Sequence, residues 1–396
     1  MIETLLLPAV REFIHEHMND DPAQLMLQAH RYHGLPMREI VQQIQAYKKA
    51  REKLPEWANS AHIVYPPLLS MEQCSSERTA RLKATIPAGK TLLDLTGGAG
   101  VDTYYFSRKF EQVDYVEKEK HLHALATHNM AALGVENVRT HHMTAEDFLE
   151  TQQRYFDCIY LDPARRGKQQ ERVFKLEETM PNVVNLLPKL FQKSYQVMIK
   201  ASPMLDIQQG LRALEHVKMI VVVSIDNECK EVLYLLQKGA HAGKENISAI
   251  NLSKDGSQQE FTYAIQDEID AEVRFSLPLR YIYEPNAAIL KAGAFKMIAA
   301  HYALSKLHPN SHLYTSSTFI DAFPGRSFEL KAIEKPQKKL GLAIATRKAN
   351  ITVRNFPMTV AEIRAKTGLR DGGDKYLFAT TNRDDQPVIL ICHKLT

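Results

Sequence analysis

A cluster of glycines follows an apolar segment and could bring the backbone against a nucleotide-like ligand. The segment 92–95 runs into the loop 96–100, whose sequence is Thr-Gly-Gly-Ala-Gly. Glycine has no Cβ, so the chain can turn tightly there and approach a ligand closely. We interpret the loop as a ligand site, the alternative being a structural turn between a strand and a helix.

A dinucleotide site is the less favoured form of this hypothesis. The G-x-G-x-x-G pattern needs a glycine at position 103 after Gly98 and Gly100, and the sequence has Thr103 instead. A nicotinamide cofactor is therefore not predicted.

An acid closes the next apolar run. Glu117 follows the run 113–116 and stands about twenty residues after the glycines, a spacing at which a carboxylate accepts both hydroxyls of a ribose. We predict Glu117 as the ribose ligand. The alternative is a charged start of the next helix, since 117–120 reads Glu-Lys-Glu-Lys.

A second polar segment follows the apolar run 156–161. It begins with Asp162 and Pro163 and continues through 164–166 as Ala-Arg-Arg. Parallel sheets bind ligands beyond the carboxyl ends of their strands, so this loop and the glycine loop should face one crevice. Lys200, Ser202 and Asp206 follow a later apolar run and should lie near the same crevice. The alternative for Asp162 and Pro163 is a simple strand terminator.

The glycine loop resembles motif I of class I S-adenosylmethionine (SAM)-dependent methyltransferases, where an acid is followed by a spacer and three alternate glycines. Thr96 replaces the first glycine and Gly97 is added. The resemblance implies that SAM is the cofactor, that Asp94 orients its methionine ammonium group, and that Gly98 and Gly100 lie against it.

The same family usually has an acid that binds the adenine amino group after the third strand. If 143–144 fills that slot, the acid is missing and Thr144 or a backbone amide substitutes for it. Asp147 is the other candidate. A helix cap is an equal alternative for either residue.

The segment 162–166 resembles motif IV of nucleic-acid methyltransferases, which implies that Asp162, Pro163 and Arg165 place the substrate. Enzymes that methylate carbon 5 of uracil need a cysteine after the next strand, and 199–203 contains none. Cys229 stands one strand too late for that role. Transfer to nitrogen or oxygen is therefore favoured over transfer to carbon.

Apolar runs that alternate with helical patterns predict an α/β fold with a parallel sheet. The expected strands are 91–95, 113–116, 138–141, 158–161, 196–199 and 219–225. A helix is expected at about 228–237, followed by antiparallel strands at 247–252 and 261–265. We predict an N-terminal helical domain (1–70), a Rossmann-like class I methyltransferase domain (71–268) and a C-terminal α+β domain (276–396), in which 281–286 precedes a helix at 287–304.

The C-terminal region is locally basic, although the whole chain of 396 residues has a net charge of only +4. Between residues 326 and 370 there are eleven basic and three acidic residues, a net charge of +8. The segments 75–80, 94–102, 162–166, 202–206 and 227–231 together resemble bacterial class I methyltransferases with a C-terminal THUMP-like domain. The resemblance implies that this domain grips structured RNA through its basic surface.

The bulk composition excludes several classes of protein. No apolar run reaches the roughly 18 residues that a membrane helix needs, and the N-terminus does not read as a signal peptide, so neither a membrane partner nor export is expected. The four cysteines show no C-x-x-C spacing, and no histidine has metal spacing, which predicts a cytoplasmic protein without a metal site.

These observations predict SAM-dependent methylation of a base, at nitrogen rather than carbon, in structured RNA such as rRNA or tRNA. Two alternatives stay open: a methyltransferase acting on protein or a small molecule, and a non-catalytic SAM-binding protein that interacts with RNA.

Overall fold

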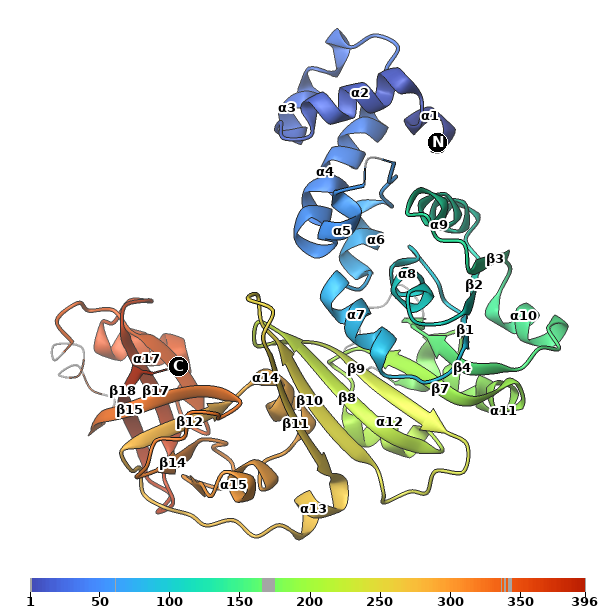
Figure 1. Ribbon diagram of the computed structural model, residues 1–396. Helices are drawn as coiled ribbons and strands as arrows, with labels where there is room; N and C mark the ends of the chain where they lie inside the picture. The colour runs from blue at the N-terminus through green and yellow to red at the C-terminus, as the bar shows by residue number, and fades with distance from the viewer. Residues whose placement is uncertain are drawn as a thin grey trace. The chain divides into compact units, whose positions relative to one another are not determined.

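The computed structural model describes residues 2–60, 62–165, 175–335, 337, 340 and 344–395. The chain divides into two compact units, residues 1–218 with 233–240 and residues 219–232 with 241–396. Figure 1 follows the chain from blue at the N-terminus to red at the C-terminus.

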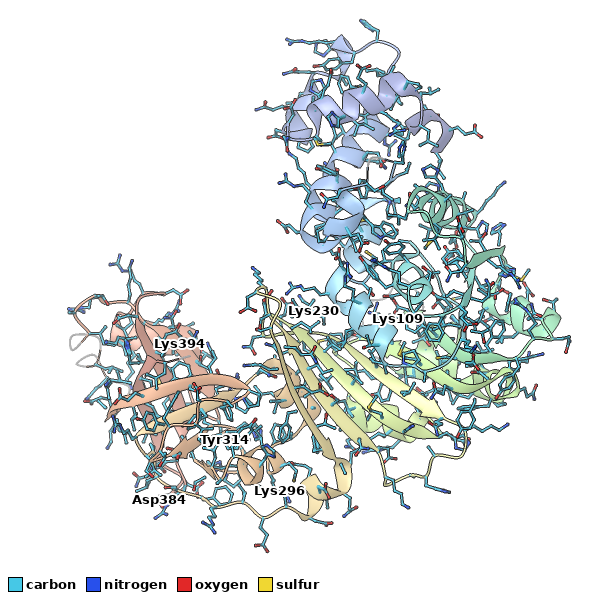
Figure 2. All side chains as sticks on the ribbon, in the orientation of Figure 1. Lys109, Lys230, Lys296, Tyr314, Asp384 and Lys394 are labelled. Atoms are coloured by element: carbon cyan, nitrogen blue, oxygen red, sulfur yellow. The ribbon has the colours of Figure 1, made fainter. Side chains whose placement is uncertain are left out.

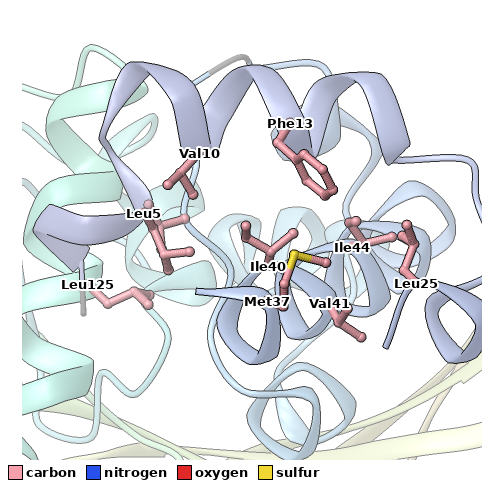
Figure 3. Close-up of a cluster of buried hydrophobic side chains, with 10 residues drawn as sticks. Leu5, Val10, Phe13, Leu25, Met37, Ile40, Val41, Ile44 and Leu125 are labelled. Carbon is pink, nitrogen blue, oxygen red and sulfur yellow. The ribbon is translucent and has the colours of Figure 1, made fainter. Parts of the chain in front are cut away.

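The first unit begins with a group of helices. Asp21 starts one of them by accepting a hydrogen bond from the Ala23 amide at 2.8 Å. Apolar side chains repeat at helical spacing along the longest helix, so Ile40 and Ile44 are fully buried, and Leu125 of the sheet-bearing part completes their core (Figure 3). The helices are α1 (Ile2–Leu5), α2 (Pro8–His17), α3 (Pro22–Leu27), α4 (Met37–Lys53), α5 (Pro55–Ala58), α6 (Leu68–Gln73) and α7 (Glu77–Thr85).

A parallel sheet follows, which confirms the predicted α/β fold. Its strands in this unit pair in the order β7-β4-β1-β2-β3, all parallel. They are β1 (Thr91–Asp94), β2 (Gln112–Glu117), β3 (Val138–His142), β4 (Phe156–Leu161) and β7 (Ser194–Ala201). The connecting helices are α8 (Val101–Ser107), α9 (Lys120–Ala132), α10 (Ala145–Thr151), α11 (Val183–Lys193) and α12 (Ile207–Ala213).

The strand order reverses beside β1. This strand pairs with β2 on one side and with β4 on the other, so that Asp94 stands opposite both Tyr115 and Tyr160. Sheets of this kind bind ligands beyond the carboxyl ends of the strands at such a reversal. The glycine loop leaves β1 at this point, and the loop with Asp162 leaves β4 beside it.

The helix predicted at about 228–237 is wrong, because this segment is strand β9 (Glu228–Gln237). Strand β8 (Val217–Ile225) ends at a two-residue turn in which Asp226 and Asn227 both have positive φ, at 50° and 65°. This backbone form suits a tight β-hairpin and reverses the chain into β9. The full sheet order is β11-β10-β8-β9-β7-β4-β1-β2-β3.

In the second unit, β10 (Asn246–Leu252) and β11 (Gln258–Ala264) form the predicted antiparallel pair, and β10 also pairs parallel with β8. The short helix α13 (Ile265–Asp270) follows. A second sheet has the order β13-β14-β12-β15-β18-β17-β16, and α17 (Val360–Thr367) begins at a capping box formed by Thr359 and Glu362. The strands of this second sheet are β12 (Tyr281–Pro285), β13 (Ser305–Lys306), β14 (Tyr314–Ser316), β15 (Gly325–Glu334), β16 (Asn350–Arg354), β17 (Lys375–Thr381) and β18 (Pro387–Lys394).

The single helix predicted at 287–304 is divided into α14 (Ala287–Ala292) and α15 (Met297–His301). Gly293 ends the first of them with φ of +83°, a left-handed conformation that glycine adopts without strain. Tyr314 lies on β14 (Figure 2). Its hydroxyl donates to the Phe295 carbonyl at 2.8 Å and links β14 to the loop between these helices. Among the helices that the structure describes, none has the length and apolar character to cross a membrane.

Candidate functional site

The glycine loop bends sharply as it leaves β1. Gly98 and Gly100 have φ of +53° and +81°, which a side chain would strain. Gly97 is constrained differently, because a Cβ there would lie 2.0 Å from the Tyr115 ring. A Cβ at Gly98 would meet nothing closer than 3.9 Å, so this part of the loop has room for a ligand.

Asp94 lies buried at the end of β1, directly before this loop. Its carboxylate accepts from the Thr96 amide at 3.1 Å and from the Thr103 hydroxyl at 2.7 Å. Burial raises the pKa of Asp94 to about 7, and the nearby carboxylates of Asp102 and Asp162 add to that rise. Since both of these hydrogen-bond donors are neutral, Asp94 is a carboxylate suited to receive a cationic group. Thr103 occupies the position at which a dinucleotide site would have glycine.

Glu117 lies buried at the end of β2 and faces the same loop. Its Oε2 accepts from the Gly98 amide at 2.9 Å, and its Oε1 accepts from the Glu119 amide at 2.7 Å. The two backbone donors fix the direction of the carboxylate. Each carboxylate oxygen has two lone-pair sites, so this geometry leaves acceptor capacity for hydroxyl groups.

The two candidates for adenine recognition belong to one helix cap. Thr144 is the N-cap of α10, and its hydroxyl accepts from the Asp147 amide at 3.1 Å. The side chain of Asp147 is exposed in the first turn of the helix. The cap accounts for Thr144 structurally, and the role of either residue toward adenine stays a prediction.

The Asp162 loop is tied to both neighbouring strands. The Asp162 amide donates to the Thr96 hydroxyl at 2.6 Å, which links this loop to the glycine loop. On the other side, Lys200 at the end of β7 donates to Asp162 Oδ2 at 2.6 Å. Pro163 follows, and the backbone of Arg165 forms the short strand β5 (Ala164–Arg165), which pairs with β6 (Thr179–Met180). Arg166 lies outside the described residues.

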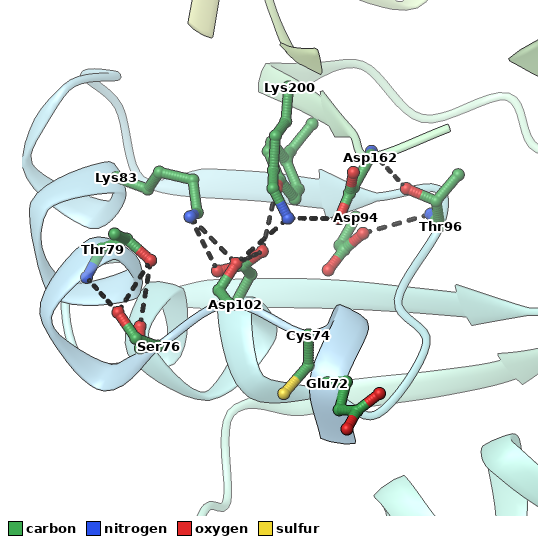
Figure 4. A network of polar contacts seen from close by, with 12 residues as sticks. Glu72, Cys74, Ser76, Thr79, Lys83, Asp94, Thr96, Asp102, Asp162 and Lys200 are labelled. Carbon is green, nitrogen blue, oxygen red and sulfur yellow. Dashed lines mark hydrogen bonds and ion pairs between the residues drawn. The ribbon is translucent and has the colours of Figure 1, made fainter. Parts of the chain in front are cut away.

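A buried polar network that the sequence analysis did not find joins this loop to the first turn of α8 (Figure 4). The Asp102 carboxylate accepts from the hydroxyls of Ser75 and Tyr160, both at 2.8 Å. Lys83 is fully buried and stands 3.4 Å from Asp102 Oδ1. Burial alone would raise the pKa of Asp102, but the ammonium groups of Lys83 and Lys200 hold that pKa below its ordinary value.

One signal for this network was present in the sequence. Lys83 follows Ala80 at a spacing that places both on the buried face of α7, and a lysine at such a position needs an anionic partner. The partner itself, Asp102, is distant in sequence and is set beside Lys83 by the packing of α7 on α8.

One histidine of this unit, His141, has a structural partner on the sheet. His141 contacts the buried carboxylate of Asp114 at 2.7 Å, and Arg154 forms an ion pair with the same carboxylate. In the part of the chain that the structure describes, no group of three or more histidine, cysteine, aspartate or glutamate side chains could hold a metal ion.

Family models match three parts of this chain. A family model described as conserved hypothetical protein 95 matches residues 81–220, a ferredoxin-like domain matches 281–324, and a THUMP domain-like model matches 325–394. The crystal structure of a protein from Porphyromonas gingivalis W83, named a methyltransferase by inference, is 32% identical with a TM-score of 0.87, and the match covers 100% of this chain and 98% of that one. The chain belongs to this family of methyltransferases with a C-terminal THUMP-like domain.

Two more distant structures share only part of the methyltransferase chain. An rRNA methylase from Streptococcus thermophilus is 14% identical over 41% of this chain and 94% of its own, with a TM-score of 0.31. TrmK of M. capricolum, solved with S-adenosylhomocysteine, is 12% identical over 42% of this chain and 68% of its own, with a TM-score of 0.33. No curated protein matches this methyltransferase.

Cys229 of the methyltransferase lies on β9, and burial raises its pKa to about 11. A thiol with a raised pKa is a poor nucleophile at neutral pH. The preference for nitrogen over carbon as the methyl acceptor stays a prediction.

Proposed function

We propose that this methyltransferase transfers a methyl group from SAM to a nitrogen atom of a base in structured RNA, such as rRNA or tRNA. The observation that carries the proposal is the position of three carboxylates, Asp94, Glu117 and Asp162, at the carboxyl ends of the adjacent strands β1, β2 and β4. Asp94 and Glu117 are placed to bind the cofactor. Asp162 is placed to accept a hydrogen bond from a donor on the substrate.

The residues around the glycine loop fit SAM. The Asp94 carboxylate would bind the methionine ammonium group, and the Glu117 carboxylate would bind the ribose hydroxyls. The open space at Gly98 would admit the cofactor against the backbone. Thr96, Gly97 and Gly100 shape the loop. Thr144 and Asp147 stay the candidates for binding the adenine base.

When bound, SAM would supply an electrophilic methyl group for the lone pair of the substrate nitrogen. The Asp162 carboxylate accepts a hydrogen bond from the N–H of that nitrogen and so directs its lone pair. The proton moves along this hydrogen bond to the Asp162 carboxylate. It can pass from there to solvent, because the Asp162 side chain is 35% exposed. Orientation of this kind is a large part of the catalytic power of many enzymes.

Exposed basic residues in the C-terminal domain support RNA as the substrate. Arg347 and Lys348 are distant in sequence from Arg370, but two backbone hydrogen bonds join these segments: the Arg370 amide donates to the Arg347 carbonyl at 2.9 Å, and the Ala349 amide donates to the Arg370 carbonyl at 3.0 Å. All three charged side chains are exposed. Lys338 and Lys339 of the same basic segment lie outside the described residues.

The triple variant Arg347→Ala, Lys348→Ala and Arg370→Ala is expected to weaken RNA binding at least tenfold. Each phosphate contact releases counterions, so the slope of log affinity against log salt should also fall by roughly two units. Filter binding with total bacterial RNA at several salt concentrations measures both. The triple variant of Arg38, Lys49 and Arg51 to alanine removes the same charge from exposed positions on α4 and should bind like the wild type. Equal loss in both variants would contradict a local RNA surface.

SAM affinity is expected to rise with pH until about pH 7 and then level off. The pKa of Asp94 is raised to about 7, so protonated Asp94 predominates below that pH and only the carboxylate attracts the ammonium group. The dissociation constant should fall roughly fivefold to tenfold between pH 5.5 and 6.5. Isothermal titration calorimetry measures it, and Asp94→Asn should bind weakly with no such slope. A pH-independent wild type would remove Asp94 from the cofactor site.

Turnover and product identity test the function as a whole. RNA from source cells lacking the gene is incubated with the purified protein and SAM carrying a labelled methyl group, and its nucleosides are then analysed by mass spectrometry. The proposal expects label in one base-methylated nucleoside that is also missing from those cells. Label in protein or in a small molecule, or SAM binding without transfer to RNA, would overturn it.

A further inference from the structure

Lys200 joins the Asp162 loop to the buried network beneath it. Its Nζ lies 2.6 Å from Asp162 Oδ2 and 3.3 Å from Ser75 Oγ. The side chain of Lys200 is 12% exposed, whereas that of Asp162 is 35% exposed. The ammonium group therefore approaches the carboxylate from the protein side, and the more accessible part of the carboxylate belongs to the crevice.

The position of Lys200 is fixed by its own surroundings. The Ser75 hydroxyl that accepts from Lys200 also accepts from Lys83 at 3.0 Å and donates to Asp102 at 2.8 Å. Two lysines and two aspartates thus share one network, and their charges balance. A lysine side chain in such a site is stable only while its ammonium group is paired and hydrogen-bonded, so it has little freedom to move.

Asp162 gains its direction from this contact. Its amide is held by Thr96 and its Oδ2 by Lys200, so both the backbone and the side chain of the residue are restrained. An ionised carboxylate accepts hydrogen bonds and donates none. A carboxylate held in this way selects a substrate group that donates, which is an N–H rather than a carbonyl oxygen.

We propose that Lys200 is a positioning residue for methyl transfer, which holds the Asp162 carboxylate in the direction of the substrate N–H and is itself held by Ser75 and Asp102. The inference rests on the proposed function, since it assigns to Lys200 the orientation of the group that recognises the methyl acceptor. Lys200 does not touch the substrate in this arrangement and acts through Asp162.

The test compares Lys200→Met, Lys200→Arg, Asp162→Asn and the double variant Lys200→Met/Asp162→Asn. Misplacement of a reacting group by about 1 Å can cost 10²-fold in rate. Lys200→Met should therefore lower kcat roughly tenfold to hundredfold, with the apparent KM for RNA and the Kd for SAM changed less than threefold. Lys200→Arg keeps the charge and donor and should recover most of kcat. The substrate probe is RNA from source cells lacking the gene.

The double variant separates positioning from a structural role. Because Lys200 acts through Asp162, Lys200→Met should cost less than threefold more once Asp162 is asparagine. The same loss in both backgrounds, or a kcat for Lys200→Met within threefold of the wild type, overturns the inference. Lys200→Gln provides the same comparison if the methionine variant does not fold. A wild type that does not methylate RNA refutes the proposed function instead, so the two failures are distinguishable.

Discussion

Replacing Asp162 by alanine is expected to slow methyl transfer by roughly 10²–10³-fold while SAM affinity stays within about threefold of the wild type. The substitution removes the carboxylate that accepts the substrate N–H, and losses of roughly 10²–10³-fold are typical when one such orienting or stabilising group is removed. The cofactor contacts of Asp94 and Glu117 do not involve the Asp162 side chain, so binding should persist. Single-turnover transfer measures the first quantity and calorimetry the second.

Asp157→Ala is the matched control for this experiment. Asp157 stands near the opposite end of the same strand, where it accepts from the amides of Lys90 and Thr91 at 2.7 and 2.9 Å. Its loss should lower thermal stability but leave kcat near the wild-type value at temperatures where the protein is folded. Equal loss of turnover and of SAM affinity in Asp162→Ala would reassign Asp162 to the cofactor site or to the fold.

Glu117→Ala is expected to raise the dissociation constant for SAM by at least about a hundredfold. A hydrogen bond to a charged group contributes about 1.5–3 kcal/mol, and the proposed ribose contact has two of them. The variant also releases the amides of Gly98 and Glu119 from their acceptor, which loosens the loop. Calorimetric titration with SAM and with S-adenosylhomocysteine measures the loss.

Glu119→Ala is the control for this second prediction. Glu119 is an exposed acid two residues further on, and its side chain makes no hydrogen bond that caps α9. SAM affinity should be unchanged in this variant. If Glu119→Ala weakens binding as strongly as Glu117→Ala, the effect is one of general charge, and Glu117 is not the ribose ligand.

The methyltransferase sheet could be predicted from the sequence because its information is local. Short apolar runs separated by helical patterns mark each parallel strand, and the turn of the chain after β1 requires glycines that tolerate positive φ at positions 98 and 100. The caps at Asp21 and Ser76 are equally local, because their side chains bond amides two or three residues away. Constraints that act between residues so close in the chain can be recognised from the sequence alone.

The errors arose where local patterns are ambiguous. The run 232–236 is apolar throughout and suits either a buried helix or a strand that is buried on both faces. Its conformation depends on sheet pairing and on the turn at Asp226 and Asn227. The helix expected at 287–304 is likewise divided at Gly293. The left-handed backbone of this glycine ends the first helix instead of continuing it.

The sequence by itself determined the class of fold and placed the glycine loop, Glu117 and Asp162 at the ends of three different strands, β1, β2 and β4. Only the tertiary structure decided which of these groups touch. Lys200 and Asp162 are 38 residues apart and meet because β7 pairs with β4, and Lys83 meets Asp102 because α7 packs on α8. Such contacts depend on long-range packing, which the spacing of residues along the chain does not encode.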